Sequence, residues 1–297
     1  MFHSILVPLD GSTLAEQAVP LAAGVAEQHE ATLSLAVVHP WGPAEDAPRP
    51  ATQADHKLRE EEGIYLNRLM QAVASAYRIP VCEAVLDGAA TGHTLVEYAR
   101  RRKIDLVVAS THDHGALGRF LSSGVARYLA HQARAGMLFI KPQVEPLPIR
   151  LGGFQRVLVA LDGSARAEAA LQPATALASR DAVLILVGVT SGRGQLRAQH
   201  RADAMSYFEE LVPRVREYGR QVQTAVLDGA NPAAAILAYA EAERIDLIAL
   251  TTRERGLAAR TLFGSMADAA IHKSAVPVLV CHAPSEPQAA SQPTPAR

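Results

Sequence analysis

Ile5-Leu-Val-Pro-Leu-Asp-Gly-Ser12 is a short apolar run that ends in an acidic turn, and an alanine-rich helical pattern follows it. Val157-Leu-Val-Ala-Leu-Asp-Gly-Ser164 repeats this arrangement in the second half of the chain. A buried strand, a turn and an amphipathic helix produce such a pattern. The same structural unit is therefore expected to open two separate parts of the sequence.

Further repeats indicate that the chain is one domain written twice. The hexapeptide Ala84-Val-Leu-Asp-Gly-Ala89 recurs unchanged from Ala225 to Ala230. Asp105 and Asp246 lie 141 positions apart, whereas Asp10 and Asp162 lie 152 apart, so the first copy is longer between residues 40 and 84. Two units of this length predict a duplicated globular domain, because solenoid repeats run to only about 20 to 50 residues. Two such domains in one chain are expected to pack as a pseudo-dimer.

The composition is that of globular domains with no global charge. The chain has 297 residues, of which 49% are hydrophobic and 20% are charged, and its formal net charge is -1. Each half can bury a core of its own, and nothing global recruits nucleic acid or an acidic membrane. Cys82 and Cys281 stand in apolar runs at non-equivalent positions, which argues against a disulfide framework. With no signal sequence or long apolar stretch, we expect a cytoplasmic protein without nucleic-acid or membrane partners.

Five strands are expected in each copy, with helical patterns between them. Apolar strands that alternate with helices predict a parallel sheet covered on both faces, so each copy is a doubly wound α/β domain. In such sheets ligands bind beyond the carboxyl ends of the strands, where the strand order switches. The expected strands are 5–9, 33–38, 83–86, 105–109 and 137–140, and then 157–161, 183–189, 224–227, 246–250 and 278–281.

Proline and glycine mark the boundaries between the domains. Residues 143–153 contain two prolines and two glycines and predict a linker, which places the two domains at 1–142 and 154–283. The Pro-rich tail 284–297 lacks the apolar groups needed to fold, so disorder is expected there. Four prolines and mixed charges in residues 40–57 predict a mobile loop near the ligand-binding edge. A lid and a simple surface insertion are both compatible with that loop.

The opening runs, together with three later segments, resemble the universal stress protein family. These segments are Asp105-Leu-Val-Val-Ala-Ser-Thr-His112, Asp246-Leu-Ile-Ala-Leu-Thr-Thr252 and Val276-Pro-Val-Leu-Val280. The resemblance covers nearly the whole chain, twice. It implies a five-stranded parallel sheet in the order 3-2-1-4-5, with the last strands pairing the two domains. Association of two chains into a homodimer is compatible with it.

The resemblance also implies an adenine-nucleotide site in each half. ATP-binding members hold adenine and ribose near the strand-one acid and a strand-two valine, and hold phosphates on a Gly-x-x-Gly-x9-Gly-(Ser/Thr) loop after strand four. The first copy matches these positions with Pro8, Asp10, Val38, Ser110, Asp113, Ser123, Gly124 and Val125. The second copy matches them with Asp162, Val189, Thr251, Glu254, Gly264, Ser265 and Met266, and has Ala160 in place of the proline.

Both phosphate loops depart from the family pattern. Asp113 and Glu254 each stand where a glycine would let backbone N–H groups approach phosphate oxygens. Two like charges about 4 Å apart at an effective dielectric of about 20 repel by roughly 4 kcal/mol, unless Mg²⁺ bridges them. We therefore expect weakened ATP binding in both halves. The second half is the better candidate because Gly264-Ser265 is intact.

Several motifs have an alternative interpretation without a ligand. Asp10 and Asp162 can simply accept N–H groups in Asp-Gly-Ser turns, and the two Asp-Gly pairs at 87–88 and 228–229 also favour turns. His112-Asp113-His114 offers metal-binding side chains, but adjacent residues on a loop seldom converge on one ion, so no metal site is expected. The basic run 100–103 complements a helix dipole or meets an acidic partner.

Three functional classes are compatible with these features. The first is a nucleotide-responsive stress regulator without catalytic turnover. The second is a structural or partner-binding protein whose pockets are vestigial. The third is an enzyme such as a slow ATP hydrolase, which ranks last because no catalytic triad, Cys-His pair, acid pair or metal-ligand set emerges from the chain.

Overall fold

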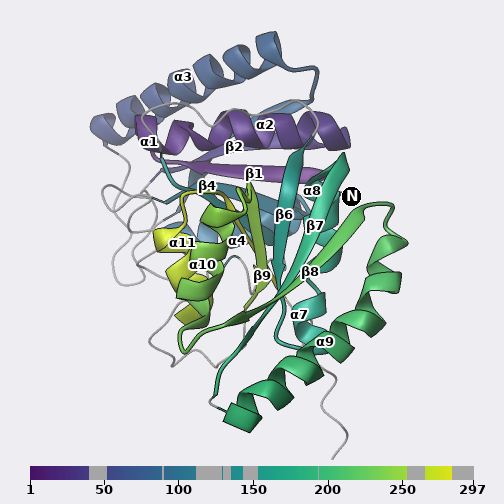
Figure 1. Cartoon of the computed structure of the whole chain (residues 1–297). Coiled ribbons are helices and arrows are strands. Elements are labelled where there is room, and N and C mark those ends of the chain that lie inside the picture. Colours follow the sequence, from purple (N-terminus) through teal and green to yellow (C-terminus); the bar gives the residue numbers. More distant parts are fainter. Residues whose placement is uncertain are drawn as a thin grey trace, which may run out of the picture.

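The computed structural model describes residues 1–39, 52–88, 90–111, 129, 135–142, 153–192, 194–252 and 265–282. Strands and helices alternate through both halves (Figure 1). The first half contains β1 Ser4–Leu9, α1 Thr13–Glu16, α2 Ala18–His29, β2 Thr32–His39, α3 Gln53–Ala76, β3 Val81–Asp87, α4 Thr91–Arg101, β4 Leu106–Ser110 and β5 Gly136–Ile140. The second contains β6 Phe154–Ala160, α7 Ala165–Glu168, α8 Leu171–Leu177, β7 Ala178–Thr190, α9 Gly194–Arg216, β8 Gln221–Asp228, α10 Pro232–Ala242, β9 Leu247–Thr251, α11 Ser265–Lys273 and β10 Val278–Cys281.

One ten-stranded sheet runs through the described part of both halves, in the order β3-β2-β1-β4-β5-β10-β9-β6-β7-β8. Every strand pair within a half is parallel. The predicted order 3-2-1-4-5 is therefore confirmed in the first half, and in the second half when its strands are counted from β6. The switch in strand order lies between β1 and β4, and again between β6 and β9.

The two halves join through their last strands, as predicted. β5 and β10 pair antiparallel, with Val278 opposite Phe139, Leu279 opposite Leu138 and Val280 opposite Met137. All these side chains are buried. Their pairing satisfies the backbone groups of two apolar edges that would otherwise be templates for association. The chain is thus an intramolecular pseudo-dimer with a continuous sheet.

The strands at and beside the seam are buried on both faces of the sheet. All five residues of β4 are buried, and so are all four residues of β10. Such uninterrupted apolar runs are typical of parallel strands that have helices on both sides. The outer strands β3 and β8 have a half-exposed pattern along their whole length. Among the described residues, no helix has the length and apolar character needed to cross a membrane.

Two long helices accompany the outer strands, in intervals where the sequence predicted helical patterns without fixed bounds. α3 packs on β2 and β3, and α9 packs on β7 and β8 (Figure 1). The prediction of a loop over 40–57 is wrong for its last residues, because Thr52 caps α3 through a reciprocal bond pair with Asp55. Residues 40–51, where a lid was considered, lie outside the described residues. The predicted linker, except for Gly153, and the tail also lie outside them.

The second half departs from the first just before its second strand. β7 begins at Ala178, five residues earlier than expected, and Ala178 pairs with Phe154. The register then shifts between Phe154 and Arg156. α8 is correspondingly short, whereas α2 in the first half has twelve residues.

A smaller contact joins the halves away from the seam. The Gln28 side-chain amide donates to the carbonyls of Ala176 at 3.4 Å and Ala178 at 3.5 Å. The next residue, His29, ends α2 and is only 7% exposed, with its ring edge-on to Phe2. No hydrogen-bond partner for its Nε2 exists among the described residues. Protonation of His29 would place a charge beside this contact, which burial disfavours and the Ala176 carbonyl only partly offsets.

We expect the protein to lose stability as the pH falls below about 6.5, the ordinary histidine pKa. Burial is the main cause that lowers the pKa of His29, and the N-terminal amine adds to it. The unfolded chain therefore binds the proton more readily, and the free energy of unfolding declines between pH 6.5 and the folded pKa. Urea titrations at about pH 7.5 and about pH 5.5 measure this. His29→Phe should reduce the difference, and an undiminished difference in that variant would assign it to other groups.

Gly153 should be the least replaceable of the turn glycines that open each half. Its φ is +90°, and an added Cβ would lie 2.7 Å from the Leu177 carbonyl oxygen. At Gly163, with φ +81°, an added Cβ would have open space around it. Gly153→Ala should lower the free energy of unfolding by about 2–4 kcal/mol, from backbone strain and overpacking. Gly163→Ala should lower it by about 1–2 kcal/mol, from strain alone. Equal losses in chemical denaturation would contradict this ranking.

Candidate functional site

The strand-one acids form the same turn in both halves. Asp10 Oδ1 accepts hydrogen bonds from the Ser12 backbone N–H at 3.0 Å and the Ser12 hydroxyl at 2.6 Å. The Ser12 hydroxyl oxygen in turn accepts from the Ala15 N–H at 3.2 Å and caps α1. Gly11 supplies the positive φ of +81° that the turn requires. The ligand-free interpretation of this acid as a turn former is thus correct for one of its oxygens.

The second half repeats this geometry closely. Asp162 Oδ1 accepts from the Ser164 N–H at 3.1 Å and the Ser164 hydroxyl at 2.5 Å. Ser164 caps α7 by accepting from the Ala167 N–H at 3.2 Å. Both acids have further interactions in the fold. Each turn therefore holds its carboxylate in a fixed place just beyond the end of a central strand.

The parallel registers bring the predicted residues to one edge in the first half. Leu9 pairs with Val37, so Asp10 follows β1 beside Val38. Leu6 pairs with Val107, and this register continued along the strands places Ser110 at the same carboxyl edge. Pro8 lies inside β1, buried, and pairs with Ala36. It is therefore a buried part of the strand and does not lie at the carboxyl edge.

The same edge in the second half carries the equivalent set. Ala160 pairs with Val187, which places Asp162 beside Val189. Val159 pairs with Ala249, so Thr251 ends β9 at that edge. Ser265 and Met266 begin α11, as the intact Gly-Ser pair predicts for a helix start. Asp268 lies in the first turn of this helix and opposes an anion there.

Ser110 differs from its counterpart in burial. It is 1% exposed, and its hydroxyl has no hydrogen-bond partner among the described residues. Thr251 is only half-buried. The other predicted phosphate-loop residues lie outside the described residues, namely Asp113, Ser123, Gly124, Val125, Glu254 and Gly264. Their roles stay predictions from the sequence, as does the loop 112–114.

Acids at the opposite edge have a structural role. Asp105 accepts the His3 N–H at 2.7 Å and the Ser4 N–H at 3.2 Å. Asp246 accepts the Gln155 N–H at 2.7 Å and the Arg156 N–H at 2.9 Å. Each therefore ties the start of strand four to the start of strand one. These matching acids lie at the amino ends of the strands, away from the ligand-binding edge.

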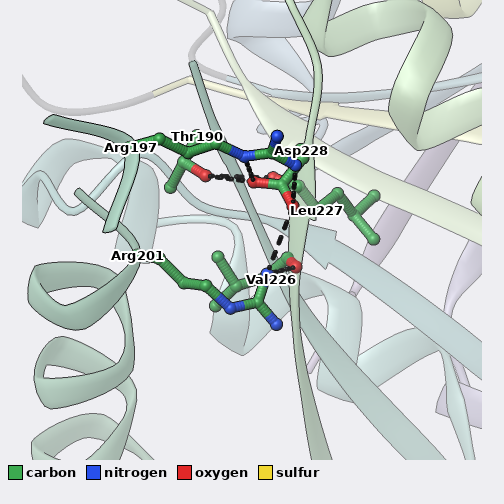
Figure 2. Close-up of polar contacts among 6 residues, drawn as sticks. All are labelled: Thr190, Arg197, Arg201, Val226, Leu227 and Asp228. Atoms are coloured by element: carbon green, nitrogen blue, oxygen red, sulfur yellow. Dashed lines mark hydrogen bonds and ion pairs between the residues drawn. The ribbon is translucent and has the colours of Figure 1, made fainter. Parts of the chain in front are cut away.

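The long helices contribute charged residues that the sequence analysis missed. Asp87, at the end of β3, forms an ion pair with Arg59 of α3. Asp228, at the end of β8, accepts from Arg197 Nε at 2.9 Å and lies 3.5 Å from a terminal guanidinium nitrogen of Arg201 (Figure 2). The two Asp-Gly pairs are thus anchors for helices as well as turns. The identical hexapeptides that contain these pairs were the available sequence signal, but they do not indicate which arginines pair with the two acids.

Asp228 is the more strongly engaged of these two acids. The hydrogen bond from Arg197 is the main cause that lowers its pKa to about 2, with Thr190 and Arg201 contributing. The Thr190 hydroxyl donates to Asp228 Oδ1 at 3.1 Å (Figure 2). In the first half the residue at the position of Thr190 is His39, whose Nδ1 lies 2.8 Å from Glu62 Oε2. The two edges therefore share a backbone frame but differ in charge.

A second repeated cluster joins each long helix to the first short helix of its own half, α1 or α7. Tyr207 donates to Glu168 at 3.2 Å, and Arg214 pairs with Glu168 at 2.9 Å. In the first half Arg68 pairs with Glu16 at 3.1 Å and lies over the Tyr65 ring. Burial first, and the neighbouring glutamate next, raise the pKa of both tyrosines. They are neutral packing groups at physiological pH.

No group of three or more metal-ligating side chains occurs within the described ranges.

Both halves of the chain match the same protein family. The model of the universal stress protein family matches residues 1–141 and 153–282. A universal stress protein of Methanocaldococcus jannaschii is 25% identical over 142 residues, which are 48% of this chain and 83% of that protein.

Solved structures resemble the chain over nearly its full length. A universal stress protein from Archaeoglobus fulgidus superposes with a TM-score of 0.72 at 19% identity, covering 94% of this chain and 96% of that one. A functionally unknown protein from Pseudomonas aeruginosa gives a TM-score of 0.61 at 17% identity, covering 95% and 93%. At these identities the likeness concerns the tandem fold.

The two arginines on Asp228 should be what holds the first turns of α9 against the sheet. Asp228→Asn removes the charge, so backbone amides 194–203 should exchange hydrogen faster. Amides near the buried Phe208, Leu211 and Val215 should keep their protection. Asp87→Asn, the matched change in the first half, should leave α9 unaffected. Unchanged exchange at 194–203 in Asp228→Asn would show that other contacts hold this segment.

Proposed function

The chain belongs to the universal stress protein family, and we propose that it acts as a stress-response regulator that binds an adenine nucleotide more readily in its second half than in its first. The observation that carries this proposal is the repeated Asp-Gly-Ser turn at the switch in strand order. That turn supports a site because it fixes a carboxylate beside Val38 or Val189. Ligands of doubly wound sheets bind at this position.

The preference for the second half rests on its phosphate side. Gly264-Ser265 is intact and leads into α11, whose N-terminal N–H groups favour an anion against the opposing charge of Asp268. In the first half the corresponding pair reads Ser123-Gly124. Glu254 and Asp113 oppose phosphate in the two halves, so the proposal is for weakened binding that Mg²⁺ strengthens.

We propose a binding role without catalytic turnover. Oδ1 of each strand-one acid accepts from the serine hydroxyl of its own turn, which supports a positioning role for the carboxylate. A regulator of this type responds to nucleotide level through occupancy. The alternative, a structural or partner-binding protein with vestigial pockets, predicts no nucleotide binding in either half.

Glu254→Gly should raise ATP affinity in the second half. The change removes a like charge and restores close backbone approach beside Gly264-Ser265, so a gain of about tenfold or more is expected at low Mg²⁺. Calorimetric titration of ATP with and without Mg²⁺ measures it. Asp113→Gly is the matched control and should gain less, because Ser123-Gly124 is also altered.

Three results would count against this proposal. Tight wild-type binding without Mg²⁺ would mean that the carboxylates do not weaken the site. A folded Glu254→Gly protein with unchanged affinity would show that Glu254 is not the determinant. Absence of any ATP or adenosine binding, together with nucleotide-free purified protein, would favour the vestigial alternative.

A further inference from the structure

The sheet has one outer strand in each half, because β3 and β8 end the strand order. In the described part of the chain, β2 is the only strand that pairs with β3, and β7 is the only strand that pairs with β8. An outer strand presents a row of N–H and C=O groups that can pair with a strand of another chain. Each half therefore has one edge at which a further strand can add.

Two hydrogen bonds show which backbone groups of β8 face this edge. The Thr190 hydroxyl of β7 donates to the Leu227 carbonyl at 3.3 Å, so Leu227 faces β7. The Arg201 guanidinium, from α9, donates to the Val226 carbonyl at 2.9 Å (Figure 2). Successive residues of a strand direct their N–H and C=O groups to alternate sides. The residues whose backbone groups face outward are therefore Val222, Thr224 and Val226.

The outer strand of the first half has the same backbone arrangement. The Gly88 N–H donates to the His39 carbonyl of β2 at 3.1 Å, so the odd-numbered residues of β3 face outward. Glu83 is the central one of these. Thr224 lies 141 positions further along the chain, at the matching place on β8. The two edges therefore share their geometry and differ in charge at their centre.

This charge decides which edge is open to antiparallel self-pairing. Like charges that stand directly opposite one another on paired strands are destabilising, so Glu83 protects the edge of β3. Residues 221–227 of β8 contain no charged residue, no proline and no glycine. Thr224 is exposed there, and the valines on either side of it are partly exposed. The edge of the second half is therefore the unprotected one.

A second copy of this chain fits the edge of β8. When two β8 strands run antiparallel with Thr224 opposite Thr224, each Val222 lies opposite Val226 of the other copy, because both are two residues from the centre. Valine then packs on valine, and the two threonines form a favourable cross-strand pair. Arg201 is compatible with this pairing, since a carbonyl oxygen has two lone pairs and can accept a second N–H. The seam between β5 and β10 joins the two halves by antiparallel pairing of the same kind.

We propose that the outer edge of β8 is an interface at which two copies of this chain pair antiparallel about Thr224. The sheet of one copy then continues into the sheet of the other, and the two β3 strands lie at the far ends. Glu83 protects those ends, so the assembly closes at two chains and does not grow into a fibre. One strand pair with its flanking helices makes a small interface, so a dissociation constant in the micromolar range is expected.

Light scattering of the full chain from about 1 to about 100 µM tests this interface. The mass of the wild type should rise from one chain toward two. Thr224→Glu gives β8 the residue of the matching β3 position and should raise the dissociation constant about tenfold or more, because two carboxylates then stand opposite each other. Thr224→Pro should act in the same direction, since it removes an outward N–H that no strand of the chain uses. Glu83→Pro is the matched control at the other edge and should leave the association unchanged.

Hydrogen exchange resolved by residue locates the contact in the wild type. The outward amides of Val222 and Thr224 should exchange more slowly at about 100 µM than at about 1 µM. The amides of Gln223 and Ala225 face β7 and should be equally protected at both concentrations. Circular dichroism confirms that each variant is folded.

Three results would overturn the interface. A mass of one chain at every concentration would show that this edge does not bind a second copy. Association that is unchanged in folded Thr224→Glu and Thr224→Pro would place the contact elsewhere. A wild-type mass that keeps growing beyond two chains would show that β8 meets β3, against the pairing about Thr224. No nucleotide is present in these measurements, so their outcome is independent of the proposed function.

Discussion

Antiparallel pairing of β5 with β10 is the interaction on which the rest of the molecule depends. Each half ends its sheet in an apolar strand whose backbone groups need partners, and each strand provides them for the other. Burial of Met137, Phe139 and Leu279 at this seam excludes water from the backbone bonds. Because the strands run in opposite directions there, the halves are related by an approximate two-fold axis. The outer strands of the whole sheet are then β3 in the first half and β8 in the second, and a long helix packs on each of them.

The duplicated frame separates residues that support the fold from residues that can vary. The Asp-Gly-Ser turns and the acids Asp105 and Asp246 keep their hydrogen bonds in both halves, because the same backbone groups must be satisfied in each. The Glu-Tyr-Arg clusters beneath the long helices are similarly repeated. Such features act on stability, and their presence in both halves says little about which half binds a ligand.

Charge at the carboxyl edges is where the halves differ. The first half places His39 and Glu62 at the end of β2, and the second places Thr190 there with two arginines on Asp228. An edge with surplus positive charge suits an anion better than a neutral one. Two copies of one domain can in this way keep one fold while the charges at their carboxyl edges diverge.

The sequence by itself determined the duplication, the strand order expected from the family resemblance, and the position of the Asp-Gly-Ser turns. The duplication and the turns follow from local patterns, because apolar runs, turn residues and caps act over a few neighbouring residues, whereas the strand order was implied by the family resemblance. The start of the long helix α3 was missed because the prolines before it suggested a loop as far as residue 57, although Thr52 and Asp55 carried a capping signal. Only the tertiary structure decided that Arg197 and Arg201 meet Asp228, and that His29 lies beside the second half. These groups are far apart in the chain, and which side chains meet depends on how the elements pack.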